Sequence, residues 1–157
     1  MKPVEFLVIH CTATPQRREV TGAQIRLWHT APPPAGRGWK QVGYTDMIHL
    51  NGGVERLAAN NDDGIVDAWE ITNGVAGMNS RIRSIVYVGG LDKAGVPMDT
   101  RTREQKEAMK KYVFDFIRRN PTVKVAGHNQ FSSKHCPSFN VPDWLRLIGV
   151  KPQNIKE

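Results

Sequence analysis

Runs of apolar residues along the chain predict the strands of a sheet. Residues 5–10 contain Phe-Leu-Val-Ile, and residues 85–90 read Ile-Val-Tyr-Val before two glycines. Near-continuous apolar content is typical of strands that lie in the middle of a sheet with both faces covered. Residues 42–50 and 54–57, joined by Asn-Gly-Gly, predict a hairpin. Residues 123–126 predict one further short strand.

Two capping-box sequences mark where helices begin. Thr21 is followed three residues later by glutamine, and Thr102 repeats the pattern, so each predicts a helix that starts at the next residue. The first helix is expected over residues 22–29, with Ile25 and Trp28 toward the core. The second shows an apolar stripe at helical spacing, and a third, short helix is expected over residues 142–148. The stripe of the second helix consists of Met109, Tyr112, Val113, Phe116 and Ile117.

The remaining segments are loops. Three prolines in residues 31–38 remove backbone donors and predict a stiff loop. Residues 58–79 are polar and rich in Gly and Asn, which leaves a short strand or an irregular loop open. We expect a domain over residues 1–150 and a frayed tail over residues 151–157. Strands interleaved with helices, plus one hairpin, predict a single α/β domain with a central mixed β-sheet flanked by helices.

Composition and charge narrow the class of protein. With 157 residues, 39% hydrophobic and 24% charged, the chain is sized for one globular domain. The net charge of +7 favours polyanionic partners, either nucleic acid or an anionic cell wall. No run of Lys and Arg is longer than a pair, so nucleic-acid binding is not expected. No apolar run reaches the roughly 20 residues of a membrane helix. No secretory signal is visible, so we expect synthesis in the cytoplasm and export by another route.

Two histidines and a cysteine are candidates for a metal site. His10 closes the first apolar run, while His128 and Cys136 lie far downstream. Two imidazoles and a thiolate suffice for a catalytic zinc and leave a fourth position open for water. Spacing alone also allows a strand-end histidine and a buried cysteine. Cys11 points to the opposite strand face from its neighbour, so we expect it in the core and without a disulfide.

An ordered set of short sequence words surrounds these residues. Together they resemble the type-2 N-acetylmuramoyl-L-alanine amidase family, which includes phage lysozymes of the amidase kind and peptidoglycan recognition proteins. The resemblance runs from Phe6 to Trp144, nearly the whole chain. The words are His-Cys-Thr-Ala-Thr from His10, Ile-Arg-Leu-Trp-His from Ile25, Gly38-Trp39, Val-Gly-Tyr from Val42, Val-Gly-Gly from Val88, and Lys-His-Cys-Pro-Ser-Phe from Lys134.

The resemblance implies a set of site residues. It makes His10, His128 and Cys136 the ligands of a Zn²⁺ ion. Tyr44 matches the family's catalytic tyrosine, expected to donate a hydrogen bond or relay a proton. Lys134 matches the catalytic lysine, expected to stabilise an oxyanion. Without the family words, a strand tyrosine packed on the sheet and a solvated loop lysine would explain both residues.

The other three histidines are weaker candidates. His29 is expected to line the cleft or to cap the first helix. His49 alternates with apolar neighbours and is expected to face solvent. His135 is expected to point away from the metal.

The function that the resemblance implies is hydrolysis of the amide between N-acetylmuramic acid and L-alanine in peptidoglycan. A phage or prophage endolysin, monomeric and released to the cell wall by a holin, fits best. The alternative is a non-catalytic peptidoglycan-binding module, but such relatives typically lack the cysteine ligand. Two departures bear on substrate contacts. Many relatives carry a histidine in the loop before the Val-Gly-Gly strand, and the corresponding place here is near Gly74. The proline loop, residues 31–38, resembles an insertion.

Overall fold

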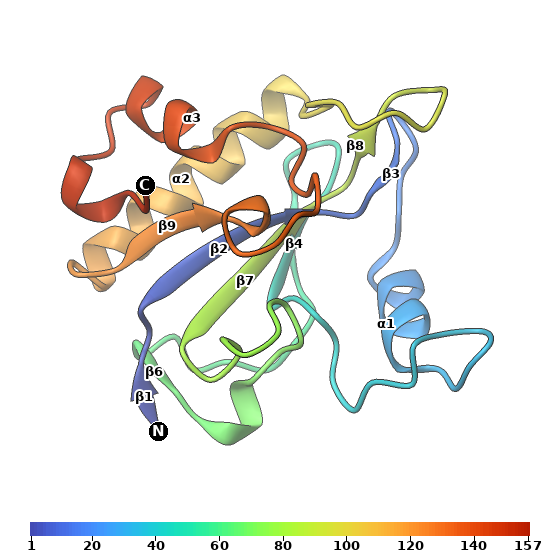
Figure 1. Cartoon of the computed structure of the whole chain (residues 1–157), viewed down its shortest axis with the longest axis horizontal. Helices are drawn as coiled ribbons and strands as arrows, with labels where there is room; N and C mark the ends of the chain where they lie inside the picture. Colours follow the sequence, from blue (N-terminus) through green and yellow to red (C-terminus); the bar gives the residue numbers. More distant parts are fainter.

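A five-stranded mixed sheet forms the centre of the fold (Figure 1). The computed structural model describes residues 1–157. Four strands run parallel and one edge strand, β5, is antiparallel, so the expected mixed sheet in a single α/β fold is confirmed. In spatial order the strands are β5 (Val54–Arg56), β4 (Asp46–Ile48), β7 (Ile82–Tyr87), β2 (Phe6–Cys11) and β9 (Lys124–Gly127).

Strand β2 lies inside the sheet, between β7 and β9, as its apolar sequence predicts. Its residues alternate between the two faces. Leu7 and Ile9 belong to the large core on one face, whereas Val8 belongs to a smaller apolar cluster on the other. His10 therefore points to the same face as Val8, away from the large core.

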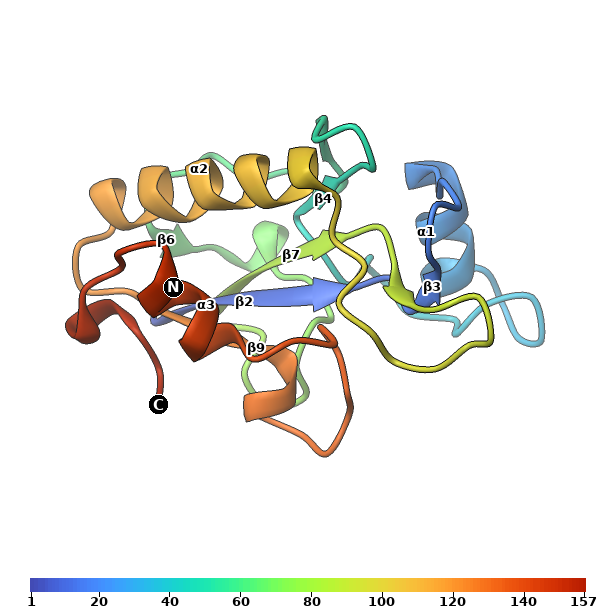
Figure 2. The ribbon, with the colours of Figure 1, turned by 90° about the horizontal axis from the view of Figure 1, so that it is seen from above.

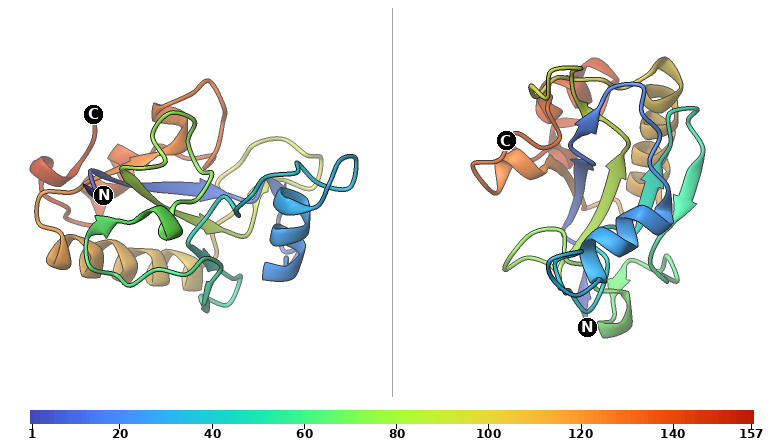
Figure 3. Two further views of the ribbon diagram at one scale, coloured as in Figure 1. Left: turned by 90° about the horizontal axis from the view of Figure 1, so that it is seen from below. Right: turned by 90° about the vertical axis from the view of Figure 1, so that its right-hand side faces the viewer.

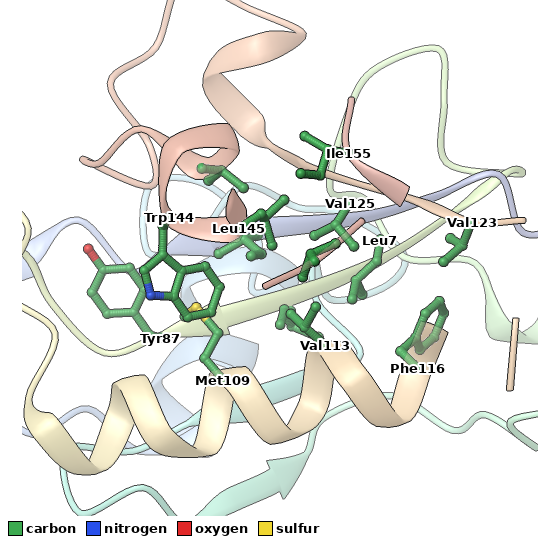
Figure 4. Close-up of a cluster of buried hydrophobic side chains, with 14 of the residues drawn as sticks. Leu7, Tyr87, Met109, Val113, Phe116, Val123, Val125, Trp144, Leu145 and Ile155 are labelled. Carbon is green, nitrogen blue, oxygen red and sulfur yellow. The ribbon is translucent and has the colours of Figure 1, made fainter. Parts of the chain in front are cut away.

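Helices α2 (Arg103–Arg119) and α3 (Val141–Leu147) cover the face that carries the large core. Figure 4 shows α2 on one side of this core and α3 on the other, with side chains of the sheet between them. The Thr102 capping box that the sequence predicts is present, with both hydrogen bonds formed. Met109, Val113 and Phe116 of the predicted apolar stripe are buried in this core.

The last residues of the chain pack on the same face, so the prediction of a frayed tail is wrong. After the short 3-10 helix η3 (Pro152–Asn154), Ile155 is only 1% exposed and belongs to the large core. The amide of Asn154 donates to the carbonyls of Pro121 and Val123, both at 2.8 Å. The N–H of Lys156 donates to the carbonyl of Val125. The tail thereby extends the sheet beside β9.

The opposite face is covered mainly by loops and by helix α1 (Gly22–Thr30). Figure 2 shows α2 on one side of the strands, η2 (His128–Gln130, orange) on the other, and α1 beyond the arrowheads of β2 and β7. The right-hand view of Figure 3 also places α2 and η2 on opposite sides. None of the helices combines the length and the apolar composition that crossing a membrane requires.

Helix α1 begins at the predicted capping box but buries a different face from the one expected. Ile25 is buried as predicted, whereas Trp28 is 37% exposed and His29 is buried in its place. The physical reason is a contact with a distant segment: the N–H of Gly43 donates to His29 Nδ1 at 2.9 Å. This hydrogen bond turns the helix so that His29 faces inward.

The hairpin has shorter strands than predicted. Only Asp46–Ile48 and Val54–Arg56 pair, because the segment before Asp46 bends toward α1. The Asn-Gly-Gly turn is present, with Gly52 at a φ of 85° that favours glycine. The sequence left either a short strand or an irregular loop open for residues 58–79. This segment contains the two-residue strand β6 (Ile65–Val66), which pairs with β1 (Lys2–Pro3), and the 3-10 helix η1 (Ala68–Glu70). Strands β3 (Thr14–Pro15) and β8 (Gly90–Leu91) form a small separate pair.

Candidate metal centre and cleft

Parallel pairing of β2 and β9 brings His10 and His128 side by side. Ile9 lies opposite Gly127 in the register of the two strands, and each histidine is the next residue of its chain segment. Their imidazole ring centroids are 4.7 Å apart. Because the carboxyl ends of parallel strands meet at one edge of a sheet, two residues that are 118 positions apart become neighbours.

Cys136 approaches the two imidazoles from the loop after η2. One ligand atom each of His10, His128 and Cys136 lies within 4.8 Å of the others. The backbone N–H of Cys11 donates to Cys136 Sγ at 3.2 Å. Such a donor stabilises negative charge on sulfur. The structure therefore brings together the three residues that the sequence singled out.

Two contacts hold the loop that carries Cys136. The hydroxyl of Tyr87 donates to the carbonyl of Pro137 at 2.6 Å, in a buried position. The guanidinium of Arg101 lies 3.5 Å from the ring centroid of Phe139 and forms an ion pair with Asp99. The buried core thus fixes the segment that directly follows Cys136.

The protonation states of the three residues suit a cation. Burial, helped by the neighbouring His128, holds the pKa of His10 well below its usual value. Burial and the Lys134 cation lower the pKa of His128. Both imidazoles are therefore neutral near pH 7, the form that binds metals. The adjacent Cys11 thiol and burial raise the pKa of Cys136, so its thiol keeps its proton until a cation replaces it. Two nitrogens and one sulfur form a donor set that fits zinc.

Tyr44 lies beside these residues, on the bent segment before β4. Its ring centroid is 5.0 Å from that of His10 and 5.2 Å from that of His29. Burial raises the pKa of Tyr44, so the phenol keeps its proton at neutral pH and can donate a hydrogen bond. Burial also lowers the pKa of His29 to about 4, which leaves its Nδ1 free to accept from Gly43. His29 therefore holds the backbone beside Tyr44 and does not line the cleft.

A cleft of about 460 Å³ opens next to His128. This volume is ordinary for a ligand site. Lys134 lies on its rim with an exposed side chain, so the structure places this residue at the cleft. No carboxylate lines the cleft, which suits an anionic ligand. The other lining residues are Trp39, Asn73, Gly74, Val75, Ala76, Asn79, Phe131 and Ser132.

The remaining histidines lie outside the site. His135 is exposed and belongs to neither the metal cluster nor the cleft. His49 does not face solvent freely, contrary to the prediction, because its side chain is only 21% exposed. Its two ring nitrogens contact Glu19 and Glu55 at 2.9 and 2.8 Å. Burial alone would lower the pKa of His49, but these two carboxylates raise it.

Sequence reasoning missed one residue beside His10. Ser84, on β7, places its hydroxyl 3.0 Å from His10 Nε2. Gly74 lies against that hydroxyl and also lines the cleft. A polar residue inside an apolar strand was the available signal for Ser84. Cys11 lies in the large core as predicted, and both cysteines are free thiols.

Comparison with known proteins gives consistent matches. A family model described as N-acetylmuramoyl-L-alanine amidase matches residues 1–139. The endolysin of Enterobacteria phage K11 is 30% identical over 138 residues, which cover 88% of this chain and 83% of that protein.

Solved structures also match this chain over most of its length. The N-acetylmuramoyl-L-alanine amidase LysC from Clostridium intestinale superposes with a TM-score of 0.70 at 20% identity, covering 96% of this chain and 88% of that one. The ectodomain complex of the peptidoglycan recognition proteins LCa and LCx, bound to tracheal cytotoxin, gives 0.67 at 18% identity, with 93% and 82% covered. These structures share the fold of this chain.

Proposed function

The chain belongs to the N-acetylmuramoyl-L-alanine amidase family, and on that premise we propose that it acts through a zinc ion held by His10, His128 and Cys136. The family match over residues 1–139 bears out the resemblance read from the sequence words, and it makes the chain a peptidoglycan amidase. The observation that carries the zinc proposal is the convergence of three ligand atoms within 4.8 Å.

The three proposed zinc ligands suit the hydrolysis of an amide. When bound, zinc would act as a Lewis acid on the scissile carbonyl and would lower the pKa of a water to about 7. His10 and His128 would supply neutral nitrogens, and the N–H of Cys11 would stabilise the thiolate of Cys136. The site lies at the wall of the cleft, because His128 belongs to both.

We assign the proton and charge handling to Lys134 and Tyr44. Lys134 lines the cleft together with His128, so its ammonium group can donate to the oxyanion that develops on the scissile carbonyl. Tyr44 keeps its proton because burial raises its pKa, and its ring lies beside His10. We therefore propose a hydrogen-bond donor at this position rather than an anionic base.

The proposed substrate is the muramyl peptide of peptidoglycan. Its stem peptide carries carboxylates, and the cleft is lined by Lys134 and by no acidic residue. A related recognition-protein complex contains tracheal cytotoxin. The curated relatives are phage endolysins, and endolysins act on the cell wall, so we propose the same role here after release by a holin. The domain would span residues 1–150, with residues 151–157 packed on it.

A binding-only module is the competing proposal. Binding alone requires the cleft but does not require a complete metal site. The presence of Cys136 beside both imidazoles, with a backbone donor aimed at its sulfur, favours the enzyme.

Zinc content and amide cleavage, measured on the same protein samples, test the proposal. We expect one zinc per chain and the release of L-alanine amino termini from muramyl peptide. Cys136→Ser should lose both, because a hydroxyl is a far poorer zinc ligand than a thiolate. Cys11→Ala is the matched control, since it removes the neighbouring thiol but keeps the N–H that faces Cys136. A folded protein that cleaves the amide after complete removal of metal would overturn the proposal.

A further inference from the structure

Strand β7 places a serine hydroxyl behind the imidazole of His10. In the register of β2 and β7, His10 pairs with Val86 and Val8 pairs with Ser84. Side chains two residues apart on a strand share a face, so Ser84 and His10 point to the same side of the sheet. Ser84 Oγ lies 3.0 Å from His10 Nε2. The two residues are 0% and 1% exposed, so water does not compete for this contact.

We infer that Ser84 is a positioning residue that selects which nitrogen of His10 binds the metal. A neutral imidazole has one N–H and one lone pair. If Nε2–H donates to Ser84 Oγ, the lone pair is on Nδ1, which is then the nitrogen free for a cation. Ligating histidines generally need such an outer partner, which fixes the tautomer and the ring orientation. This inference rests on the proposed zinc site.

The surroundings hold the Ser84 hydroxyl in one place. The carbonyl of Ser84 accepts from the N–H of Thr45 at 2.8 Å, which fixes the backbone at this point of β7. On the other side, Gly74 lies so close that a Cβ on it would overlap Ser84 Oγ. The position of the Ser84 hydroxyl therefore depends on the absence of a side chain at Gly74.

Zinc affinity is the property that separates positioning from a structural role. Removing an outer partner of a ligating histidine typically weakens metal binding about 10–100-fold. We expect Ser84→Ala to raise the zinc Kd by that factor while the chain stays folded. Gly74→Ala should do the same, because its new methyl group displaces the Ser84 hydroxyl from His10.

The double variant gives the sharpest readout. If Gly74→Ala acts by displacing the hydroxyl, removal of that hydroxyl should abolish most of its effect. The zinc Kd of Ser84→Ala/Gly74→Ala should therefore match that of Ser84→Ala alone, rather than the product of two independent effects. Val113→Ala, in the core on the opposite face, is the control for a general loss of stability and should leave the Kd unchanged.

The measurement is zinc binding in competition with a chelator of known affinity, on full-length protein at one pH. Cobalt absorption spectra of the same variants report whether the ligand geometry changes. The inference is overturned if the native chain binds zinc and the folded Ser84→Ala variant binds it with the same Kd. In that case the zinc site itself stands. If the native chain binds no zinc, both fail. Additive effects in the double variant would show that Gly74 acts through another contact and would refute the displacement.

Discussion

The hydroxyl of Tyr87 offers a clean test of how the core supports the site. It donates to the carbonyl of Pro137 at 2.6 Å, and Pro137 directly follows Cys136. Phenylalanine has the same shape without the donor, so Tyr87→Phe removes this hydrogen bond and little else. Tyr87 is fully buried and Pro137 is buried too, so water does not replace the lost partner.

The size of the effect follows from the unpaired carbonyl. A buried acceptor left without a partner costs about 1–3 kcal/mol. In a chain of this length, each kcal/mol lowers the Tm by about 2–4 °C. We therefore expect a fall in Tm of about 2–12 °C for Tyr87→Phe. The segment after Cys136 also gains freedom, so the zinc Kd should rise.

Tyr112 provides a matched control. Its hydroxyl also donates over 2.6 Å, but to Asp46 Oδ2, a carboxylate that also pairs with Arg56 and Arg83 and belongs to neither the metal cluster nor the cleft. Hydrogen bonds to charged groups contribute about 1.5–3 kcal/mol. Tyr112→Phe should thus lose at least as much stability as Tyr87→Phe, yet keep the native zinc Kd.

Two measurements on both variants test whether Tyr87 supports the position of Cys136. Urea unfolding of the metal-free proteins gives the loss of stability, and competition with a chelator gives the zinc Kd. The reasoning predicts a loss of stability in both variants, at least as large in Tyr112→Phe, and a weaker zinc affinity in Tyr87→Phe only. Equal zinc affinities in the two variants would refute it, because Tyr87 would then support the core and not the position of Cys136.

Three further predictions concern other parts of the molecule. Lys134→Ala should retain zinc and lower the rate of L-alanine release about 100–1,000-fold, as expected for a lost oxyanion donor; full activity would return Lys134 to the role of a solvated loop residue. The pKa of His49 is raised by Glu19 and Glu55, so its contribution to stability is present below about pH 6.5 and is lost as the pH rises through the folded-state pKa. His49→Gln should remove that part of the pH–stability curve, and an unchanged curve would contradict the assignment. Ile155→Ala should cost about 2–5 kcal/mol in urea unfolding, whereas a cost near zero would mean that the tail does not pack as described.

The parts of the fold that depend on neighbouring residues could be read from the sequence. Both capping boxes form, because a threonine and a glutamine three residues apart satisfy backbone donors within one helical turn. The Asn-Gly-Gly turn and the apolar strands β2 and β7 follow in the same way. His10 and Cys136 could be proposed because they stand in family words, and the resemblance adds His128 as the third ligand.

The errors arose where distant segments decide the local arrangement. Helical spacing cannot tell whether Trp28 or His29 turns inward, since the hydrogen bond from Gly43 settles it. The tail has few apolar residues, yet Ile155 reaches the core because Asn154 is anchored to the carbonyls before β9. Ser84 is next to His10 only in the register of β2 and β7, which the sequence does not reveal.

The parallel pairing of β2 with β9 also determines when the enzyme can become active. β2 is synthesised near the start of translation and β9 near its end. His10 therefore cannot contact His128 until most of the chain has been synthesised. At about 5–20 residues per second, the residues between them take on the order of ten seconds to synthesise. A nascent chain that ends before Cys136 therefore lacks part of the proposed ligand set, and hydrolysis through that set would begin only after the last third of the molecule has folded onto the first strand.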